Sequence, residues 1–348
     1  MSLPQTTREY RLPKVDGFHN LTLQEGPIPP LKSTEVLLKV HAVSLQYRDL
    51  VVARGQYAFG PRKENVVPGS DMAGEIIAVG EDVVGWQVGD RAMPNFSLSH
   101  VFGEASDEGW QTALGAPIDG VLTEYKVIPA HALVRVPAHM SYEEASTLPC
   151  AAVTAYNALL GGNRKLKGGD TVLIQGTGGV SIFGLQLAVA SGATVIVTSS
   201  SDKKLEIAKK LGAKHIINYK TTPNWEEEVL KVTNGRGVDH ILEVGGPGTL
   251  AKSAKTIAYG GNLALIGVVA GAGDVSSLPL LVLAKAANMR GVLIGSRTQF
   301  EDMTRLIEAV DLKPVIDKVF DFEQLRDAYA YLESQQHVGK VVVKVSKD

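Results

Sequence analysis

The chain has 348 residues, and its 35 Lys and Arg residues nearly balance its 37 Asp and Glu residues, which gives a formal net charge of −2. This balance argues against a strongly basic nucleic-acid-binding protein and gives no reason to expect a membrane-surface protein. The longest apolar run, Leu263–Gly273, is about half of the roughly 20 residues that a membrane-spanning helix needs. The single cysteine, Cys150, excludes an intrachain disulfide and a multi-cysteine metal site. Because residues 1–30 also lack a hydrophobic signal core, the sequence predicts a cytoplasmic protein, and its length predicts two domains.

Residues 1–151 are predicted to form a mostly β domain. Short valine-rich segments at 36–43, 66–79 and 122–128 are separated by turn residues, a pattern typical of antiparallel strands. Residues 95–120 show no clear period and are predicted to be a long polar loop. Together these segments indicate a partly open β-barrel.

From residue 152 to residue 295, short apolar strands alternate with helix-period segments. This alternation predicts a parallel, doubly wound sheet with the strand order 3-2-1-4-5-6. The tail, residues 296–348, is expected to contain a helix around Phe322–Leu332 and a final strand at 340–345 that packs back on the first domain. In the second domain the expected strands are 171–175, 194–198, 215–217, 240–244, 263–267 and 290–294, and the expected helices are one that ends near Gly192 and those at 203–211, 225–232 and 249–258.

A glycine-rich segment follows the strand at 171–175 and leads into a helix. Gly176 would make the tight turn, and Gly178 would let the backbone approach a pyrophosphate at the helix N-terminus. Ser181 occupies the third glycine position of the G-x-G-x-x-G pattern, so the match rests partly on the order strand, loop, helix. The alternative is a glycine-rich turn without a ligand. The candidate cofactor-binding residues of this segment are Gly176, Gly178, Gly179 and Val180.

The end of the next strand indicates which nucleotide is bound. An NAD site usually has a carboxylate there that grips the ribose hydroxyl, whereas this chain has Ser199 and Ser200. Hydroxyl groups and a lysine, Lys204, favour the 2′-phosphate of NADP, and Asn218 and Tyr219 end the third strand nearby. The alternative is that the lysines only form the solvated face of a helix. We expect NADP(H) as the cofactor.

Several motifs resemble those of the medium-chain dehydrogenase/reductase superfamily over nearly the whole chain. They are Gly69-Ser-Asp-Met-Ala-Gly-Glu75, Gly89-Asp-Arg91, Gly120-Val-Leu-Thr-Glu-Tyr125, Leu148-Pro-Cys-Ala-Ala-Val-Thr-Ala-Tyr156 and the glycine-rich segment. The resemblance implies a GroES-like catalytic domain formed by residues 1–151 and 296–348, with a Rossmann NADP-binding domain, 152–295, inserted between them.

The zinc ligands of the superfamily's alcohol dehydrogenases are mostly replaced in this chain. Carried over residue by residue, the first Cys position is Gln46, the His position is Ser70, and only the second Cys is kept, as Cys150. The region of the structural zinc lobe, 95–120, has no cysteine. Three protein ligands are needed to hold a catalytic zinc, so we expect no metal. Residues 44–49 and 291–297 resemble instead the zinc-free branch, which contains quinone oxidoreductases, enone reductases and alcohol dehydrogenase-like proteins.

Three polar residues at a predicted strand–helix junction are the catalytic candidates: Gln46, Tyr47 and Arg48. Tyr47 could face the nicotinamide or donate a proton. Arg48 could reach the cofactor or form an ion pair with Asp71, and such a pair could also serve only to brace the fold. Cys150 is interpreted as a buried residue or a retained ligand position, not as a nucleophile.

Further cofactor contacts are expected from the resemblance and from the ends of later strands. Thr154 would lie near the nicotinamide carboxamide, and the glycines after two strands would lie at the sheet edge where dinucleotides bind. The alternative for the two basic candidates is an ordinary surface charge. The residues concerned are Thr154, Gly245, Ile266, Gly267, Arg297 and Lys340.

We therefore expect a zinc-independent, NADPH-dependent oxidoreductase. Without a metal to polarise a carbonyl, the small-molecule substrate should itself be electrophilic: a quinone, an enone or an enal. Two alternatives remain open at this point: a zinc-free alcohol dehydrogenase, ketoreductase or other tailoring enzyme, and an NADPH-binding protein without turnover. The resemblance also implies a homodimer that pairs through residues 290–294, with no nucleic-acid or membrane partner.

Overall fold

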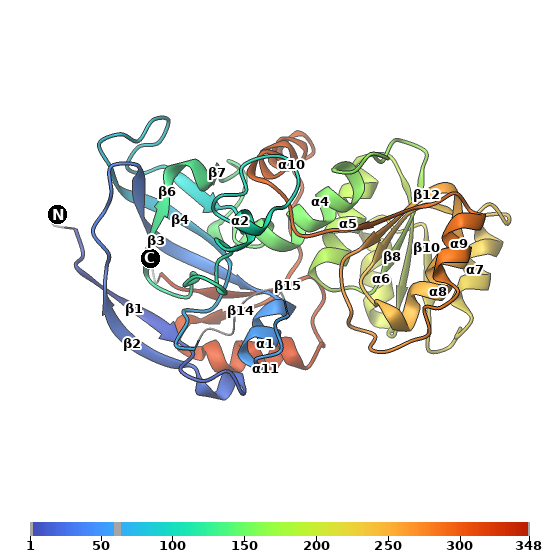
Figure 1. Cartoon of the computed structure of the whole chain (residues 1–348), viewed down its shortest axis with the longest axis horizontal. Coiled ribbons are helices and arrows are strands. Elements are labelled where there is room, and N and C mark those ends of the chain that lie inside the picture. Colours follow the sequence, from blue (N-terminus) through green and yellow to red (C-terminus); the bar gives the residue numbers. More distant parts are fainter. Residues whose placement is uncertain (1–2, 59–63, 347–348) are drawn as a thin grey trace. The chain divides into compact units, whose positions relative to one another are not determined.

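The computed structural model describes residues 3–58 and 64–346, which form two compact units. Unit 1 comprises Met1–Val153 and Gly295–Asp348, and unit 2 comprises Thr154–Ile294. The sequence analysis expected one domain of residues 1–151 and 296–348 and a second of residues 152–295. Figure 1 shows both units and labels many of their helices and strands. No helix among the described residues has the length and apolar character to cross a membrane.

Unit 1 contains a seven-stranded sheet among its described residues, in the order β14-β15-β3-β4-β5-β7 with β6 paired to β3, and a separate hairpin of β1 and β2. The strands are β1 Thr6–Arg11, β2 Thr22–Pro27, β3 Glu35–Leu45, β4 Asp71–Val79, β5 Arg91–Pro94, β6 Tyr125–Pro129, β7 Leu133–Arg135, β14 Ile316–Asp321 and β15 Lys340–Lys344. The helices are α1 Tyr47–Ala53, α2 Asp107–Trp110, α3 Tyr142–Ala145, α10 Arg297–Ala309 and α11 Leu325–Glu333, with a π-helical turn at Leu148–Ala152 and short 3-10 turns at Phe18–Asn20, Ala130–Ala132 and Phe322–Gln324.

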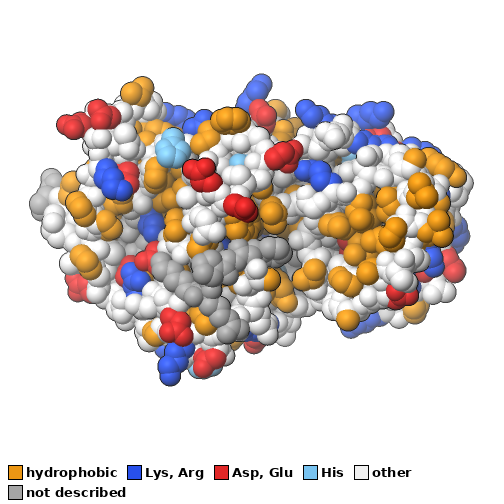
Figure 2. All heavy atoms as spheres, in the orientation of Figure 1, with side chains coloured by type: hydrophobic (Ala, Val, Ile, Leu, Met, Phe, Trp, Pro, Cys, Tyr) orange, Lys and Arg blue, Asp and Glu red, His pale blue; other side chains and the backbone are white. Residues whose placement is uncertain are grey.

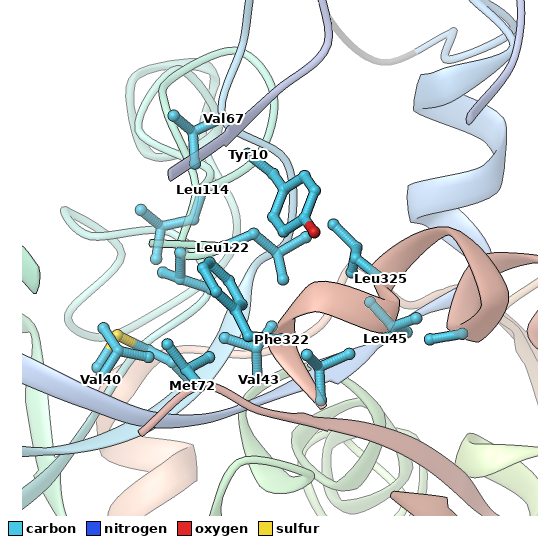
Figure 3. Packing of buried hydrophobic residues seen from close by; sticks show 14 of the residues in the cluster. Tyr10, Val40, Val43, Leu45, Val67, Met72, Leu114, Leu122, Phe322 and Leu325 are labelled. Atoms are coloured by element: carbon cyan, nitrogen blue, oxygen red, sulfur yellow. The ribbon is translucent and has the colours of Figure 1, made fainter. Parts of the chain in front are cut away.

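The core of unit 1 lies between this sheet, the hairpin and α11. Val40, Val43 and Leu45 of β3 are fully buried, and Figure 3 shows them together with Phe322 and Leu325 from the C-terminal part of the chain. The ring of Phe322 meets that of Tyr10 edge to face, at 5.1 Å between centroids. Segments from the two ends of the sequence therefore share one hydrophobic core.

The C-terminal strand completes the sheet of unit 1, as expected. β15 pairs antiparallel with β3, with Val341 opposite Leu45, and parallel with β14. Its residues Val341, Val342 and Val343 are fully buried. This pairing brings Lys340 next to the C-terminal end of β3, which is important for the site described below.

Unit 2 is a six-stranded sheet in the order β10-β9-β8-β11-β12-β13, and all its pairings are parallel. This is the predicted 3-2-1-4-5-6 order, and the predicted fold class is confirmed. The strands are β8 Thr171–Gln175, β9 Thr194–Ser199, β10 His215–Asn218, β11 Val238–Glu243, β12 Ile257–Leu265 and β13 Asn288–Gly291. The helices are α4 Val153–Leu160, which begins at the unit boundary, α5 Gly179–Ala190, α6 Asp202–Lys210, α7 Trp225–Val232, α8 Pro247–Thr256 and α9 Leu278–Ala284.

Some predicted boundaries were wrong, and several elements were missed. The strand expected at 263–267 begins at Ile257, directly after α8, because Ile257 and Ala258 are buried in the sheet and do not continue the helix. The last strand of the sheet is 288–291, earlier than the expected 290–294. The sequence analysis named neither α9 nor α10, although Ser296 and Gln299 form a capping box that marks the start of α10.

Candidate functional site

The glycine-rich segment forms an open loop between β8 and α5. Gly176 has a φ of +75°, and its N–H donates to the Thr198 carbonyl at 2.7 Å. A Cβ at Gly178 would meet no other atom within 4 Å, so the loop is open on that side. The helix α5 begins at the next residue, and the N–H groups of a first helical turn have no partner inside the helix. This combination fits an anionic phosphate group.

Ser181, at the third glycine position, stabilises the turn in a different way. Its buried hydroxyl donates to the Gln175 carbonyl at 2.7 Å. The close packing of helix on sheet occurs instead at Gly184, where a Cβ would lie 2.4 Å from Cδ2 of Leu242 and 3.2 Å from Cδ1 of Ile174. The sequence analysis missed Gly184, although its place one helical turn after Ser181 was a usable signal.

The residues expected to recognise the 2′-phosphate are neighbours at one end of the sheet. Asn218 lies opposite Ser199 in the pairing of β10 with β9, and the Tyr219 N–H donates to the Ser199 carbonyl at 3.0 Å. Ser200 follows directly, and Lys204 is half-buried on the first turn of α6. The sequence analysis overlooked Asp202, whose Oδ1 accepts a hydrogen bond from Asn218 Nδ2 at 2.7 Å.

The loops after β11 and β12 meet at the same edge of the sheet as the glycine loop. The N–H groups of Ile266 and Gly267 donate to the Glu243 carbonyl, at 2.9 and 3.3 Å. A Cβ at Gly246 would lie 2.8 Å from the Cα of Val268, so these two loops are in close contact. Gly245 belongs to the first of them. Gly176, Gly245 and Ile266 thus follow the carboxyl ends of neighbouring parallel strands, the end of such a sheet at which dinucleotides bind, and their contact with a cofactor stays a prediction.

Thr154 stands at the start of unit 2, in α4. Its side chain is buried, and its Oγ1 has no hydrogen-bond partner among the described residues. A buried hydroxyl without a partner is costly, and a ligand amide would satisfy it. The predicted contact of Thr154 with the nicotinamide carboxamide stays a prediction.

In unit 1, the buried carboxylate of Asp71 connects the three positions that correspond to the zinc ligands of the superfamily's alcohol dehydrogenases. Its Oδ2 accepts hydrogen bonds from Gln46 Nε2 at 2.7 Å and from the Cys150 backbone N–H at 2.8 Å. Its Oδ1 accepts the Ser70 hydroxyl at 2.5 Å. Gln46 is fixed further because its N–H donates to Oδ2 of Asp49, at 2.7 Å, at the start of α1.

Lys340 belongs to the same buried cluster, so the alternative of a surface charge is wrong for this residue. Its Nζ donates to the Leu45 carbonyl at 2.6 Å, and only 3% of the residue is exposed. Burial lowers the pKa of Lys340, although Asp71, Cys150 and Asp49 oppose this change. Burial also raises the pKa of Asp71 to about 7, and the nearby Lys340 charge only partly offsets it.

The other predicted residues of unit 1 have different surroundings. Tyr47 is the first residue of α1 and is 43% exposed, so its hydroxyl is not held inside the core. Arg48 donates to the carbonyls of Leu114, at 2.9 Å, and Ala116, and its guanidinium lies over the rings of Tyr57 and Phe96.

The suggested ion pair between Arg48 and Asp71 is therefore wrong, and Arg48 braces the segment around residue 115. Arg297 is similarly occupied. Its Nη1 donates to the His131 carbonyl at 2.9 Å, and its Nε lies 3.5 Å from a carboxylate oxygen of Glu301.

These residues do not fit a tetrahedral zinc centre. The amide nitrogen of Gln46 and the hydroxyl of Ser70 are both bonded to Asp71, and burial raises the pKa of the Cys150 thiol, whereas zinc binds the thiolate. Within residues 3–58 and 64–346, no three or more His, Cys, Asp or Glu side chains are grouped so that they could hold a metal ion. A preorganised hydrogen-bond network occupies the ligand positions instead.

Comparisons with known proteins agree with this architecture. Residues 32–138 match the alcohol dehydrogenase GroES-like domain, and residues 179–309 match the zinc-binding dehydrogenase family. A zinc-type alcohol dehydrogenase-like protein of Schizosaccharomyces pombe is 50% identical over 95% of this chain and 97% of its own length. The chain belongs to the medium-chain dehydrogenase/reductase superfamily. It is an oxidoreductase of that superfamily, whose members bind a nicotinamide cofactor.

Two further proteins are similar to this chain over most of its length. The acryloyl-coenzyme A reductase of Sulfurisphaera tokodaii is 30% identical over 92% of this chain and 96% of its own. The crystal structure of a provisionally assigned alcohol dehydrogenase from Sinorhizobium meliloti has a TM-score of 0.90 and 38% identity, and covers 99% of this chain and 100% of its own. The relatives thus include alcohol dehydrogenase-like proteins and an acryloyl-coenzyme A reductase.

Proposed function

We propose that this protein is an NADPH-dependent, zinc-independent oxidoreductase that transfers a hydride to an electron-poor acceptor such as a quinone, an enone or an enal. The observation that carries the proposal is the Asp71 network, in which Gln46 and Ser70 donate hydrogen bonds at two positions where a zinc enzyme has a thiolate and an imidazole. A carbonyl substrate would find no Lewis acid here, so the acceptor must be activated by its own conjugation.

The end of β9 supports the choice of NADPH. Ser199 and Ser200 at the end of β9 and Lys204 in the first turn of α6 offer hydroxyl and ammonium donors, and such donors suit a 2′-phosphate. Asp202 is a carboxylate beside this group, but Asn218 already donates to it. When bound, the nicotinamide would supply the hydride, and the glycine loop with the N-terminus of α5 would hold the pyrophosphate.

The residues of unit 1 would provide hydrogen bonds to the acceptor oxygen. Hydride addition to an enone leaves negative charge on that oxygen, and a neutral donor aimed at it lowers the barrier. Tyr47 carries a phenol hydroxyl at the start of α1, with much of its side chain exposed, and Gln46 beside it is held in one orientation by Asp71. Tyr47 would donate to the oxygen, and Gln46 would orient the substrate.

A panel of acceptors tests the reaction. The purified protein is given NADPH with quinones, enones, enals and ketones, and NADP⁺ with secondary alcohols, before and after dialysis against a chelator. We expect turnover with conjugated acceptors, no loss of activity after chelation, and no stoichiometric zinc by elemental analysis.

About one tightly bound zinc per chain, or faster oxidation of secondary alcohols than reduction of any conjugated acceptor, would support the alternative alcohol dehydrogenase. That alternative is favoured by an NAD-dependent alcohol dehydrogenase of known structure that is 30% identical, with a TM-score of 0.86.

Cofactor preference is tested with Lys204→Ala, because Lys204 is the proposed charged contact to the 2′-phosphate. Its neighbour Lys203 lies on the same helix and provides a control. Loss of one charge-assisted contact should weaken NADPH binding about ten-fold or more and leave NADH binding nearly unchanged. Lys203→Ala is the matched control, since Lys203 is exposed and should change neither affinity. Dissociation constants from nucleotide fluorescence give the answer, and equal affinities of the parent protein for NADPH and NADH would contradict the assignment.

A further inference from the structure

Glu243, the last residue of β11, is a buried acidic side chain that the proposed reaction does not use. It is fully buried, and no ion pair among the described residues includes it. Burying a carboxylate is costly unless hydrogen bonds compensate it, so its surroundings show what it does.

Five donors surround the Glu243 carboxylate. Its Oε1 accepts the N–H groups of Gly245 and Gly246, both at 2.9 Å, and the Thr249 hydroxyl at 2.5 Å. Its Oε2 accepts Nε2 of Gln175 at 2.7 Å and the hydroxyl of Ser253. The donors come from the end of β8, the loop after β11 and helix α8.

Gln175 extends the network to the glycine loop. Its Oε1 accepts the N–H groups of Val244 and Gly245, at 3.2 and 3.3 Å, and its backbone carbonyl accepts the Ser181 hydroxyl. Gln175 directly precedes Gly176. A shift of the Glu243 carboxylate would therefore move the turn at Gly176 and the turn at Gly245 together.

The backbone of Glu243 holds a third loop, because its carbonyl accepts the N–H groups of Ile266 and Gly267. One residue thus connects the chain at the ends of three adjacent strands, β8, β11 and β12. We propose that Glu243 is a positioning residue that sets the spacing of these loops for the nicotinamide cofactor. The inference rests on the cofactor binding of the proposed function, but not on the choice between NADPH and NADH.

The test is Glu243→Gln in the full-length protein. The new amide presents N–H groups to sites that are already filled with donors, so the loops must separate. We expect dissociation constants for both NADPH and NADH to rise about ten-fold, with KM for the cofactor rising more than kcat falls. An effect on both nucleotides distinguishes loop spacing from 2′-phosphate recognition.

Asp239→Asn is the matched control. Asp239 is equally buried in β11, but it lies at the opposite end of the strand, where it pairs with Arg164 and Arg236. The same change from acid to amide there should lower the melting temperature without changing cofactor affinity. If Glu243→Gln lowers the melting temperature and leaves both dissociation constants unchanged, as in the control, Glu243 is only structural and the inference is wrong.

Ser253→Ala keeps the inference testable if Glu243→Gln does not fold. This variant removes one donor to the carboxylate and should weaken both nucleotides by a few-fold in the same direction. Unchanged affinities in a folded Ser253→Ala protein would overturn the inference. If the parent protein binds neither nucleotide, the proposed function fails instead, so the two failures are separate results.

Discussion

Asp71 lies at the centre of the buried polar cluster of unit 1. It accepts hydrogen bonds from three positions that hold the metal in the superfamily's zinc branch, and Lys340 and Asp49 influence its ionisation from nearby. Burial shifts Asp71 and Lys340 toward their neutral forms, since the loss of water outweighs their mutual attraction. The cluster is therefore sensitive to protonation near neutral pH.

Asp71→Asn should change how stability depends on pH. The pKa of Asp71 is about 7 in the folded protein and 3.8 in an exposed carboxyl, so the folded state binds this proton more tightly. The proton bound by Asp71 therefore stabilises the folded state. This contribution is complete below about pH 4 and is lost as the pH rises to about 7, and over this range the free energy of unfolding falls by at most about 1.4 kcal/mol per pH unit. The free energy of unfolding of the parent protein, from urea titrations at pH 5, 6 and 7, should fall more steeply than that of the variant. Parallel curves would show that Asp71 does not titrate in this range.

At the scale of elements, the sequence predicted unit 2 better than unit 1. Each strand of a parallel sheet is a short apolar run that ends in small or polar residues, and the local pattern was enough to place β8 and α7 at the correct bounds. α9 was missed because its segment, LPLLVLA, is apolar throughout and has no helical period. Its outer residues Leu280 and Leu283 are exposed, which periodicity cannot anticipate.

In the candidate site, too, local sequence patterns predicted some residues, whereas contacts between distant segments of the chain were not predictable. The turn at Gly176 belongs to a contiguous motif, and Ser199 ends the next strand along the chain, so local patterns could place both. The contacts of Lys340 with β3 and of Glu243 with Gln175 join segments that are distant in the sequence, and no local pattern reports them. Arg48 was placed correctly at a strand–helix junction, but its carbonyl partners near residue 115 were not predictable.

At the scale of the whole molecule, we propose that unit 2 carries a homodimer interface. β13 is the last strand in its sheet, and its outer edge is unpaired among the described residues. Figure 2 shows hydrophobic side chains gathered over the part of unit 2 that carries α9. Exposed apolar side chains near this strand are those of Met289, Leu293, Leu280, Leu283 and Tyr259. An open edge strand beside apolar surface favours pairing with a second copy.

Met289→Asp combined with Leu293→Asp should disrupt this dimer. Charges of like sign placed at a two-fold interface repel each other and lose apolar burial, so the mass measured by light scattering should fall by about half. Val84→Asp is the control, because Val84 is a highly exposed apolar residue of unit 1 and should leave the mass unchanged. A parent protein that is already monomeric, or a double variant that stays dimeric, would contradict the proposed interface.

The discontinuity of unit 1 has a consequence during synthesis on the ribosome. β3 can pair early with β4 along one edge and with β6 along residues 35–39 of the other edge. Residues 42–45 of that second edge pair with β15, which is translated after all of residues 154–294. Unit 2 is continuous in the sequence, so it can fold before β15 is available to pair with β3. During that interval the apolar residues Val43 and Leu45 lie on the part of β3 whose second edge is unpaired, a template on which other nascent chains can add. The nascent protein is thus most open to aggregation in the time between the completion of unit 2 and the release of its last strand.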